Sequence, residues 1–127
     1  MHYKISYIDS TDLFMVVTSG RMHSDGYIAM AEGLLEHPRW LSDINVIFDH
    51  TALEFNRVSL ENLQKIRAFH INHEARIGSG KSAFVVKAGL SEQWQKLWDR
   101  GEKIKTKNRV QVFENCGEAI NWVNEGK

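Results

Sequence analysis

Apolar and polar residues follow two different periodicities along the chain, and each predicts a different kind of element. Tyr3, Ile5 and Tyr7 alternate with polar residues, which predicts a strand over residues 2–9 with one solvent-facing side. The apolar, β-branched run at residues 13–18 predicts a second strand, separated from the first by a short polar turn. The two strands are therefore expected to form an antiparallel hairpin.

The most apolar strand is predicted over residues 44–50, where four of the seven residues are large and apolar. It ends at the acidic Asp49, and after a loop the chain reaches Ser59, which can cap the longest predicted helix, roughly residues 59–76. In an open α/β sheet, binding sites gather at the carboxyl ends of strands, beside helix N-termini. The segment from Asp49 to Ser59 is therefore where function is expected first.

Two further stretches have the spacing of amphipathic helices. The first follows Ser24, which is predicted to cap it, and the second follows Ser91. The apolar stripe of the first contains Tyr27, Ile28, Ala31, Leu34 and Leu35, and that of the second contains Trp94, Leu97 and Trp98.

The remaining elements complete an alternating pattern. Strands are predicted at residues 83–86 and 110–113, and Asn115 with Glu118 three residues on resembles the start of a final helix. The order of elements is then ββαβαβαβα. It predicts a single α/β domain over residues 1–127 with a five-stranded mixed sheet.

Composition narrows the class of protein. The 127 residues include 16 basic and 16 acidic ones, and this zero net charge argues against a dedicated nucleic-acid binder. The lone cysteine, Cys116, cannot form an internal disulfide and fits a reducing compartment. No apolar run approaches the roughly 20 residues of a membrane span, and the N-terminus opens into a strand pattern instead of a signal peptide. These features predict a cytoplasmic protein.

The segment Ala75-Arg76-Ile77-Gly78-Ser79-Gly80-Lys81-Ser82 fits a relaxed phosphate-loop pattern, with alanine in place of the first glycine. A phosphate loop follows a strand and opens a helix, so that helical N–H groups point at the phosphate. Here a predicted helix precedes the segment and a predicted strand follows it. The segment is therefore interpreted as a helix-ending turn.

Three histidines raise the question of a metal site. His70 and His73 share one face of the long helix, but they lie far along it, whereas His50 lies near its start. The three are therefore not expected to meet at one ion. A hydrolase would need His50 to activate Ser59, yet His50 follows Asp49 directly and its side chain is expected on the opposite face. No metal, cofactor or catalytic residue is predicted.

Two other features have a structural interpretation that is preferred over a functional one. Residues 99–109 contain five basic and two acidic residues, which is typical of a solvated helix end, the alternative being an anionic partner or membrane surface. Cys116 opens a predicted helix, where the thiol pKa is expected to be lowered. It has no evident chemical partner and is interpreted as incidental.

Three stretches of sequence carry a resemblance to a known family: Glu36-His37-Pro38-Arg39-Trp40, then Val46-Ile47-Phe48-Asp49, then Val112-Phe113-Glu114-Asn115 with Glu118-Ala119-Ile120-Asn121-Trp122-Val123. With the order of elements, they resemble the STAS domain of anti-sigma-factor antagonists, and more closely the SpoIIAA-like family of small bacterial proteins. The resemblance covers nearly the whole chain. It implies a STAS-like fold and a non-enzymatic regulatory module that binds a protein partner.

The resemblance also implies a switch. In antagonist STAS domains, a regulatory phosphoserine follows the aspartate that ends the strand by ten residues, and counting ten from Asp49 gives Ser59. A phosphate there would add about −2 charge at a helix N-terminus. The implied interaction surface contains Asp49, Thr51, Arg57 and Ser59. The local sequence differs from the family's Asp-Ser-Ser-Gly-Leu pattern, and the alternative is that Ser59 is only a helix cap.

A second role follows from the likeness of SpoIIAA-like proteins to lipid-carrying CRAL-TRIO folds. It implies a carrier of a small apolar or lipid-like ligand with peripheral membrane contact. Tyr27, Ile28, Trp94 and Trp98 are the candidate apolar patch, with core packing as the alternative for the two tryptophans. An unrecognised hydrolase is a third, less favoured hypothesis. An exposed edge strand or apolar helix would also allow a homodimer.

Overall fold

Five strands form one sheet, in the order β1-β2-β3-β4-β5. The structure is a computed structural model that describes residues 1–54, 59–90, 92 and 107–125. The strands are β1 (His2–Ile8), β2 (Leu13–Arg21), β3 (Asn45–Glu54), β4 (Lys81–Val85) and β5 (Arg109–Phe113).

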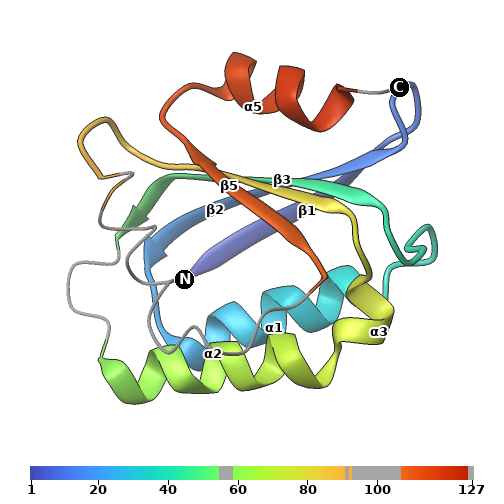
Figure 1. Cartoon of the computed structure of the whole chain (residues 1–127). Helices are drawn as coiled ribbons and strands as arrows, with labels where there is room; N and C mark the ends of the chain where they lie inside the picture. The colour runs from blue at the N-terminus through green and yellow to red at the C-terminus, as the bar shows by residue number, and fades with distance from the viewer. Residues whose placement is uncertain (55–58, 91, 93–106, 126–127) are drawn as a thin grey trace.

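The pairing within the sheet is mixed (Figure 1). The strands β1 and β2 form the predicted antiparallel hairpin, and all other neighbours pair in parallel. In the centre, Phe48 of β3 pairs with Val16 on one side and with Phe84 on the other. The predicted α/β class and the five-stranded mixed sheet are confirmed.

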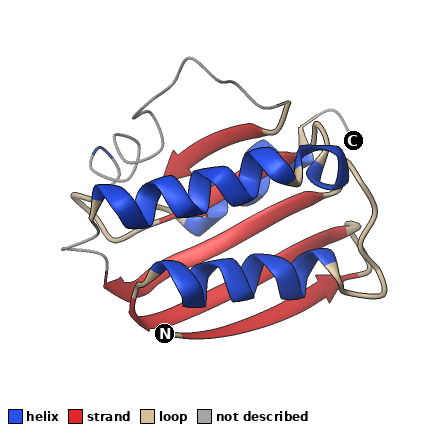
Figure 2. Cartoon of the chain, turned by 90° about the horizontal axis from the view of Figure 1, so that it is seen from below, coloured by secondary structure: helices blue, strands red, loops and turns tan. Residues whose placement is uncertain are grey.

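Helices cover both faces of the sheet (Figures 1 and 2). Side by side on one face lie α1 (Ser24–Leu35) and α2 (Leu60–Asn72), and the short α3 (Glu74–Ile77) follows α2. The opposite face is covered by α5 (Cys116–Asn124). Because side chains alternate along a strand, each strand contributes to the packing on both faces.

Two apolar cores result from this alternation. The larger lies between the sheet and the α1–α2 layer and includes Phe14, Val16, Met30, Val46, Phe48, Ile66 and Phe84. The smaller lies under α5 and contains Leu13, Ile47, Ala83, Val85, Ala119 and Val123. In β3 up to His50, even-numbered residues such as Phe48 therefore face α1 and α2, and odd-numbered ones such as Ile47 face α5; after the register shift that follows, Leu53 faces the larger core.

Several predicted boundaries differ from the structure, most of all those of the central strand and the long helix. The central strand, predicted to end at residue 50, continues to Glu54 because it goes on pairing with β2, where Arg21 lies opposite Glu54. The helix predicted over residues 59–76 is divided into α2 and α3, and His73 lies between the two. The predicted helix that carries Trp94 and Trp98 lies outside the described residues.

Candidate functional site

The N-termini of α1 and α2 meet at the edge of the sheet where the parallel strands end. Ser59 is the N-cap of α2, and its Oγ accepts a hydrogen bond from the Asn62 N–H at 3.1 Å. The side-chain oxygen of Asn62 accepts a hydrogen bond from Ser24 Oγ, also at 3.1 Å. Ser59 is therefore a helix cap, as predicted, and its exposed side chain lies beside the start of α1.

His23 caps α1 in place of the predicted Ser24. The Gly26 N–H donates to His23 Nδ1 at 3.0 Å, and His23 has the extended backbone typical of an N-cap. Ser24 is already inside the helix, where its buried hydroxyl donates to Asn62, 38 positions away. The prediction was wrong because a long-range contact competes for the serine hydroxyl.

Asp49 and Thr51 lie together, but not with Ser59. The Asp49 carboxylate accepts hydrogen bonds from the Thr51 N–H at 3.1 Å and from the Thr51 hydroxyl at 2.7 Å. Asp49 is an odd-numbered residue of β3, so its side chain lies on the α5 face, whereas Ser59 begins a helix of the opposite face. The predicted surface is thus split between the two faces, and Arg57 lies outside the described residues.

Cys116 starts α5 on the same face as Asp49. Burial raises the pKa of its thiol, and the negative charge of Asp49 raises it further. The expected lowering of the thiol pKa was therefore wrong, because partial burial and a nearby carboxylate outweigh the helix terminus.

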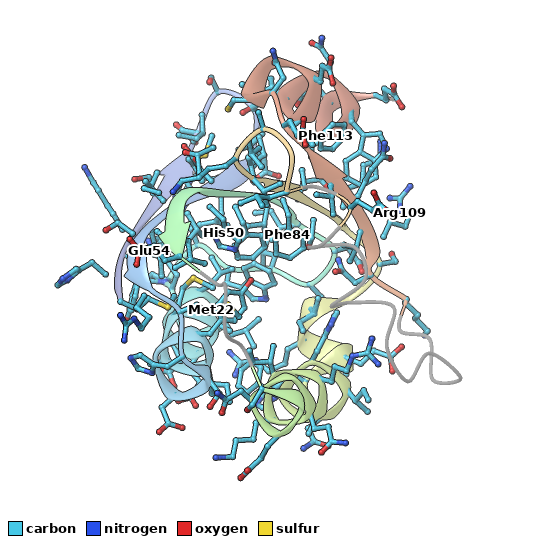
Figure 3. The ribbon with its side chains drawn as sticks, turned by 90° about the vertical axis from the view of Figure 1, so that its left-hand side faces the viewer. Met22, His50, Glu54, Phe84, Arg109 and Phe113 are labelled. Carbon is cyan, nitrogen blue, oxygen red and sulfur yellow. The ribbon has the colours of Figure 1, made fainter. Side chains whose placement is uncertain are left out.

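His50 is enclosed in the larger core. The Tyr27 hydroxyl lies 3.0 Å from its Nε2, and the Thr18 hydroxyl lies 2.6 Å from its Nδ1. Figure 3 shows His50 and Phe84 on the side of the sheet that faces α1 and α2, with Phe113 toward α5. Desolvation lowers the pKa of His50 to about 3, so the ring is neutral near pH 7.

This burial decides against His50 as a catalytic base for Ser59. Its exposed fraction is 0%, and both of its ring nitrogens are within hydrogen-bond distance of core hydroxyls. The side chain of His50 was predicted correctly on the face opposite Asp49, but its contact with Thr18 was not predicted. The signal was available, since Thr18 continues the inward-facing series of Phe14 and Val16 along β2.

An apolar cavity lies between α1, α2 and the sheet, with a volume of about 80 Å³. Tyr27 and Ile28 line it from α1, Phe69 and His70 line it from α2, and Phe84 lies in its floor. Tyr27 is itself buried and bonded to His50, so it is a wall of the cavity and not part of a surface patch. Trp94 and Trp98, the other half of the predicted patch, lie outside the described residues.

The segment that resembles a phosphate loop binds a carboxylate of the chain itself. Asp43 has a backbone φ of 74°, and its side chain accepts hydrogen bonds from the Ser79 N–H at 2.7 Å and the Ser79 hydroxyl at 3.2 Å. These bonds lower the pKa of Asp43. The position that an anion would take beside this turn is thus filled by Asp43.

The predicted separation of the three histidines is also visible. His73 stacks on Phe69 with ring centroids 4.1 Å apart, His70 lines the cavity, and His50 lies in the core. The described part of the chain contains no group of three or more histidine, cysteine, aspartate or glutamate residues arranged to hold a metal ion. Among its helices, none has the length and apolarity to cross a bilayer.

Comparison with known proteins concerns the fold. No protein-family model matches the chain, and no curated protein is significantly similar to it. An uncharacterised protein of the DUF3478 family with a SpoIIAA-like fold, from Shewanella loihica PV-4, is 15% identical with a TM-score of 0.63, over 96% of this chain and 92% of that chain. The fold is SpoIIAA-like.

A second solved structure agrees with this. The anti-sigma factor antagonist SpoIIAA, in its unphosphorylated form, is 10% identical with a TM-score of 0.56, over 98% of this chain and 99% of that chain. The SpoIIAA-like fold that three stretches of sequence predicted is therefore confirmed. At these identities the likeness concerns the backbone, so the role of each residue has to be argued from the site.

Proposed function

We propose that this SpoIIAA-like chain is a non-enzymatic regulatory module that binds a protein partner at the sheet edge where α1 and α2 begin. The observation that carries the proposal is the exposed hydroxyl of Ser59 at the N-terminus of α2. The fold supports it, because SpoIIAA, a protein with this fold, is an anti-sigma factor antagonist. Ser59 would be the switch of the module.

A phosphate on Ser59 would change this edge of the molecule in two ways. Its oxygens would replace the serine hydroxyl as acceptors for the first N–H groups of α2, where negative charge is favourable. It would also add about −2 charge beside Asp25 and Glu61, the acidic residues of the first turns of α1 and α2. A partner that contacts the neutral edge would then meet a strongly acidic one.

The test separates charge from helix capping. Ser59→Asp and Ser59→Asn both keep a good N-cap, but only the aspartate adds negative charge. We expect a phosphate on Ser59 in protein isolated from its native host, detected by mass spectrometry. We also expect Ser59→Asp to change the affinity for the cross-linked partner at least tenfold, with Ser59→Asn close to the wild-type chain.

The variant Asp49→Asn tests which face of the sheet the partner contacts. Because Asp49 and Thr51 lie on the α5 face, a partner seated on the α1–α2 edge should bind the Asp49→Asn variant normally. An unmodified Ser59 in the native host, together with equal partner affinities for Ser59→Asp and Ser59→Asn, would contradict the proposed switch.

The cavity favours a second candidate function, the carriage of a small apolar ligand. Its lining is almost entirely apolar, and cavities of this kind stay dry and take up apolar molecules. A carrier isolated from its native host should show extra mass under native conditions that disappears on denaturation. A bare chain under both conditions would count against this function.

A further inference from the structure

Ser82 is a polar residue in the mostly apolar lining of the cavity. It lies on β4 two residues before the core residue Phe84, on the same side of the strand, and it lines the cavity. Its exposed fraction is 7%. Among the described residues, no hydrogen bond of the Ser82 hydroxyl is seen, and its oxygen is not one of the fully buried unpaired side-chain atoms. The oxygen is therefore accessible from the cavity that Ser82 lines, where a bound molecule can form a hydrogen bond with it.

Asn108 and His70 also line the same cavity. Asn108 immediately precedes β5, and its amide donates to the Gly80 carbonyl at 2.7 Å, which fixes it near the start of β4. His70 belongs to the last turn of α2, and desolvation lowers its pKa, so its ring is neutral near pH 7. The cavity thus combines an apolar wall with a small number of uncharged hydrogen-bonding groups, the usual composition of a small-molecule site.

The lining also excludes some ligands. The described residues of the lining include no aspartate, glutamate, lysine or arginine, so a charged head group would be buried without a counter-charge from them. The volume of about 80 Å³ is roughly half that of the engineered cavity of about 150 Å³ that holds benzene. It therefore accommodates a short chain better than a ring.

We propose that this cavity binds a small uncharged molecule with a short alkyl chain and one hydroxyl group, which hydrogen-bonds to Ser82. The proposal rests on the carrier function and specifies the chemistry of its ligand. The alkyl chain would lie along Ile28, Ala31 and Phe84, and Ser82 would provide the one polar contact at the floor of the cavity.

The experiment uses two probes, observed by NMR on the full chain: 1-butanol, which has both parts of the ligand, and xenon, which has only an apolar surface. We expect both to shift the amide signals of cavity residues in the wild-type chain. Ser82→Ala should weaken 1-butanol binding about fivefold, the worth of one hydrogen bond, and leave xenon binding unchanged.

Two variants of α1 control for the location of the site. Ala31 lines the cavity, so Ala31→Leu should fill it and abolish the binding of both probes. Ala29, on the exposed side of the same helix, is the matched control, and Ala29→Leu should leave both probes bound. Denaturation curves of each variant confirm that it is folded before binding is measured.

The outcomes separate this inference from the function on which it rests. If xenon does not bind the wild-type chain, both the carrier function and the inference are wrong. If xenon binds but 1-butanol does not, or binds Ser82→Ala equally well, only the inference is overturned and an apolar carrier remains.

Discussion

The Tyr27 hydroxyl lies 3.0 Å from Nε2 of His50 in the interior of the protein, and this contact joins α1 to the central strand. The polar chain continues from the ring to Thr18 on β2, whose hydroxyl donates to the Asp49 carbonyl at 3.2 Å. The neutral imidazole ring donates through one nitrogen and accepts through the other, and each nitrogen has a hydroxyl within hydrogen-bond distance. Three elements are thus joined by one polar chain.

Removing the Tyr27 hydroxyl should destabilise the fold. Tyr27→Phe keeps the ring but takes away a buried hydrogen-bond donor, and we expect the free energy of unfolding to fall by about 1–3 kcal/mol in urea denaturation. Tyr3→Phe is the control, because Tyr3 is 44% exposed, and its effect should be close to zero. Equal stabilities of the two variants would contradict the assigned role of the polar chain.

Stability should decrease in mild acid because of His50. The pKa of His50 is lowered from 6.5 to about 3 in the folded chain, so between these pH values the unfolded chain binds a proton that the folded chain does not. The stability that depends on a neutral His50 is fully present above pH 6.5. As the pH falls from 6.5 toward 3, the free energy of unfolding decreases by about 1 kcal/mol per pH unit. The lowered pKa of His70 acts in the same direction.

Denaturation curves between pH 7 and pH 5 measure this slope. His50→Gln should reduce it, whereas His2→Gln, at an exposed position, should leave it unchanged. A His50→Gln chain with the wild-type slope would show that other groups cause the pH dependence.

Lys81 is expected to stabilise the C-terminal end of α5. Its ammonium group donates to the Trp122 carbonyl at 2.7 Å and to the Glu125 carbonyl at 3.3 Å, and lies 5.2 Å from the Trp122 ring centre. Lys81→Met should lower the free energy of unfolding by about 1.5–3 kcal/mol, because two charge-assisted bonds at the negative end of a helix are lost. Lys87→Met, at an exposed position, should have little effect.

Glycine-to-alanine substitutions should have opposite effects at two positions. A Cβ at Gly80 would lie 2.5 Å from the Ile44 carbonyl oxygen and 2.6 Å from that of Asp43, so Gly80→Ala should destabilise the fold by about 1–3 kcal/mol. At Gly33, in α1, the nearest atom would be Ile5 Cδ1 at 3.5 Å, an ordinary contact. Gly33→Ala should stabilise by about 0.5–1 kcal/mol through helix propensity, and thermal denaturation of both variants would check the sign.

Elements defined by local chemistry were predictable from the sequence. Ser59 and Asn115 both cap helices through their own side chains, and each accepts a hydrogen bond from the N–H three residues on. The hairpin of β1 and β2 followed from alternation and a polar turn. In each case the deciding interactions lie within a few residues along the chain.

The features that were missed depend on contacts between distant residues. The end of β3 is set by its pairing with Arg21, not by its own apolar pattern. Ser24 is withdrawn from capping by Asn62, and the faces of Asp49 and Ser59 become evident only when the helices are placed on the sheet. The cavity is a space between elements, so its polar residue Ser82 could not be distinguished from any other serine.

The attachment of α5 has a consequence for the behaviour of the protein in solution. This nine-residue helix contributes two fully buried side chains, those of Ala119 and Val123. A helix with so small a buried contact opens locally at a lower free energy than the whole domain. Each opening uncovers Leu13, Ile47 and Val85 on a flat, paired strand surface, where another chain can associate. Aggregation should therefore depend more on how often α5 detaches than on how easily the sheet unfolds. The backbone amides of α5 should also exchange hydrogen faster than those of β3.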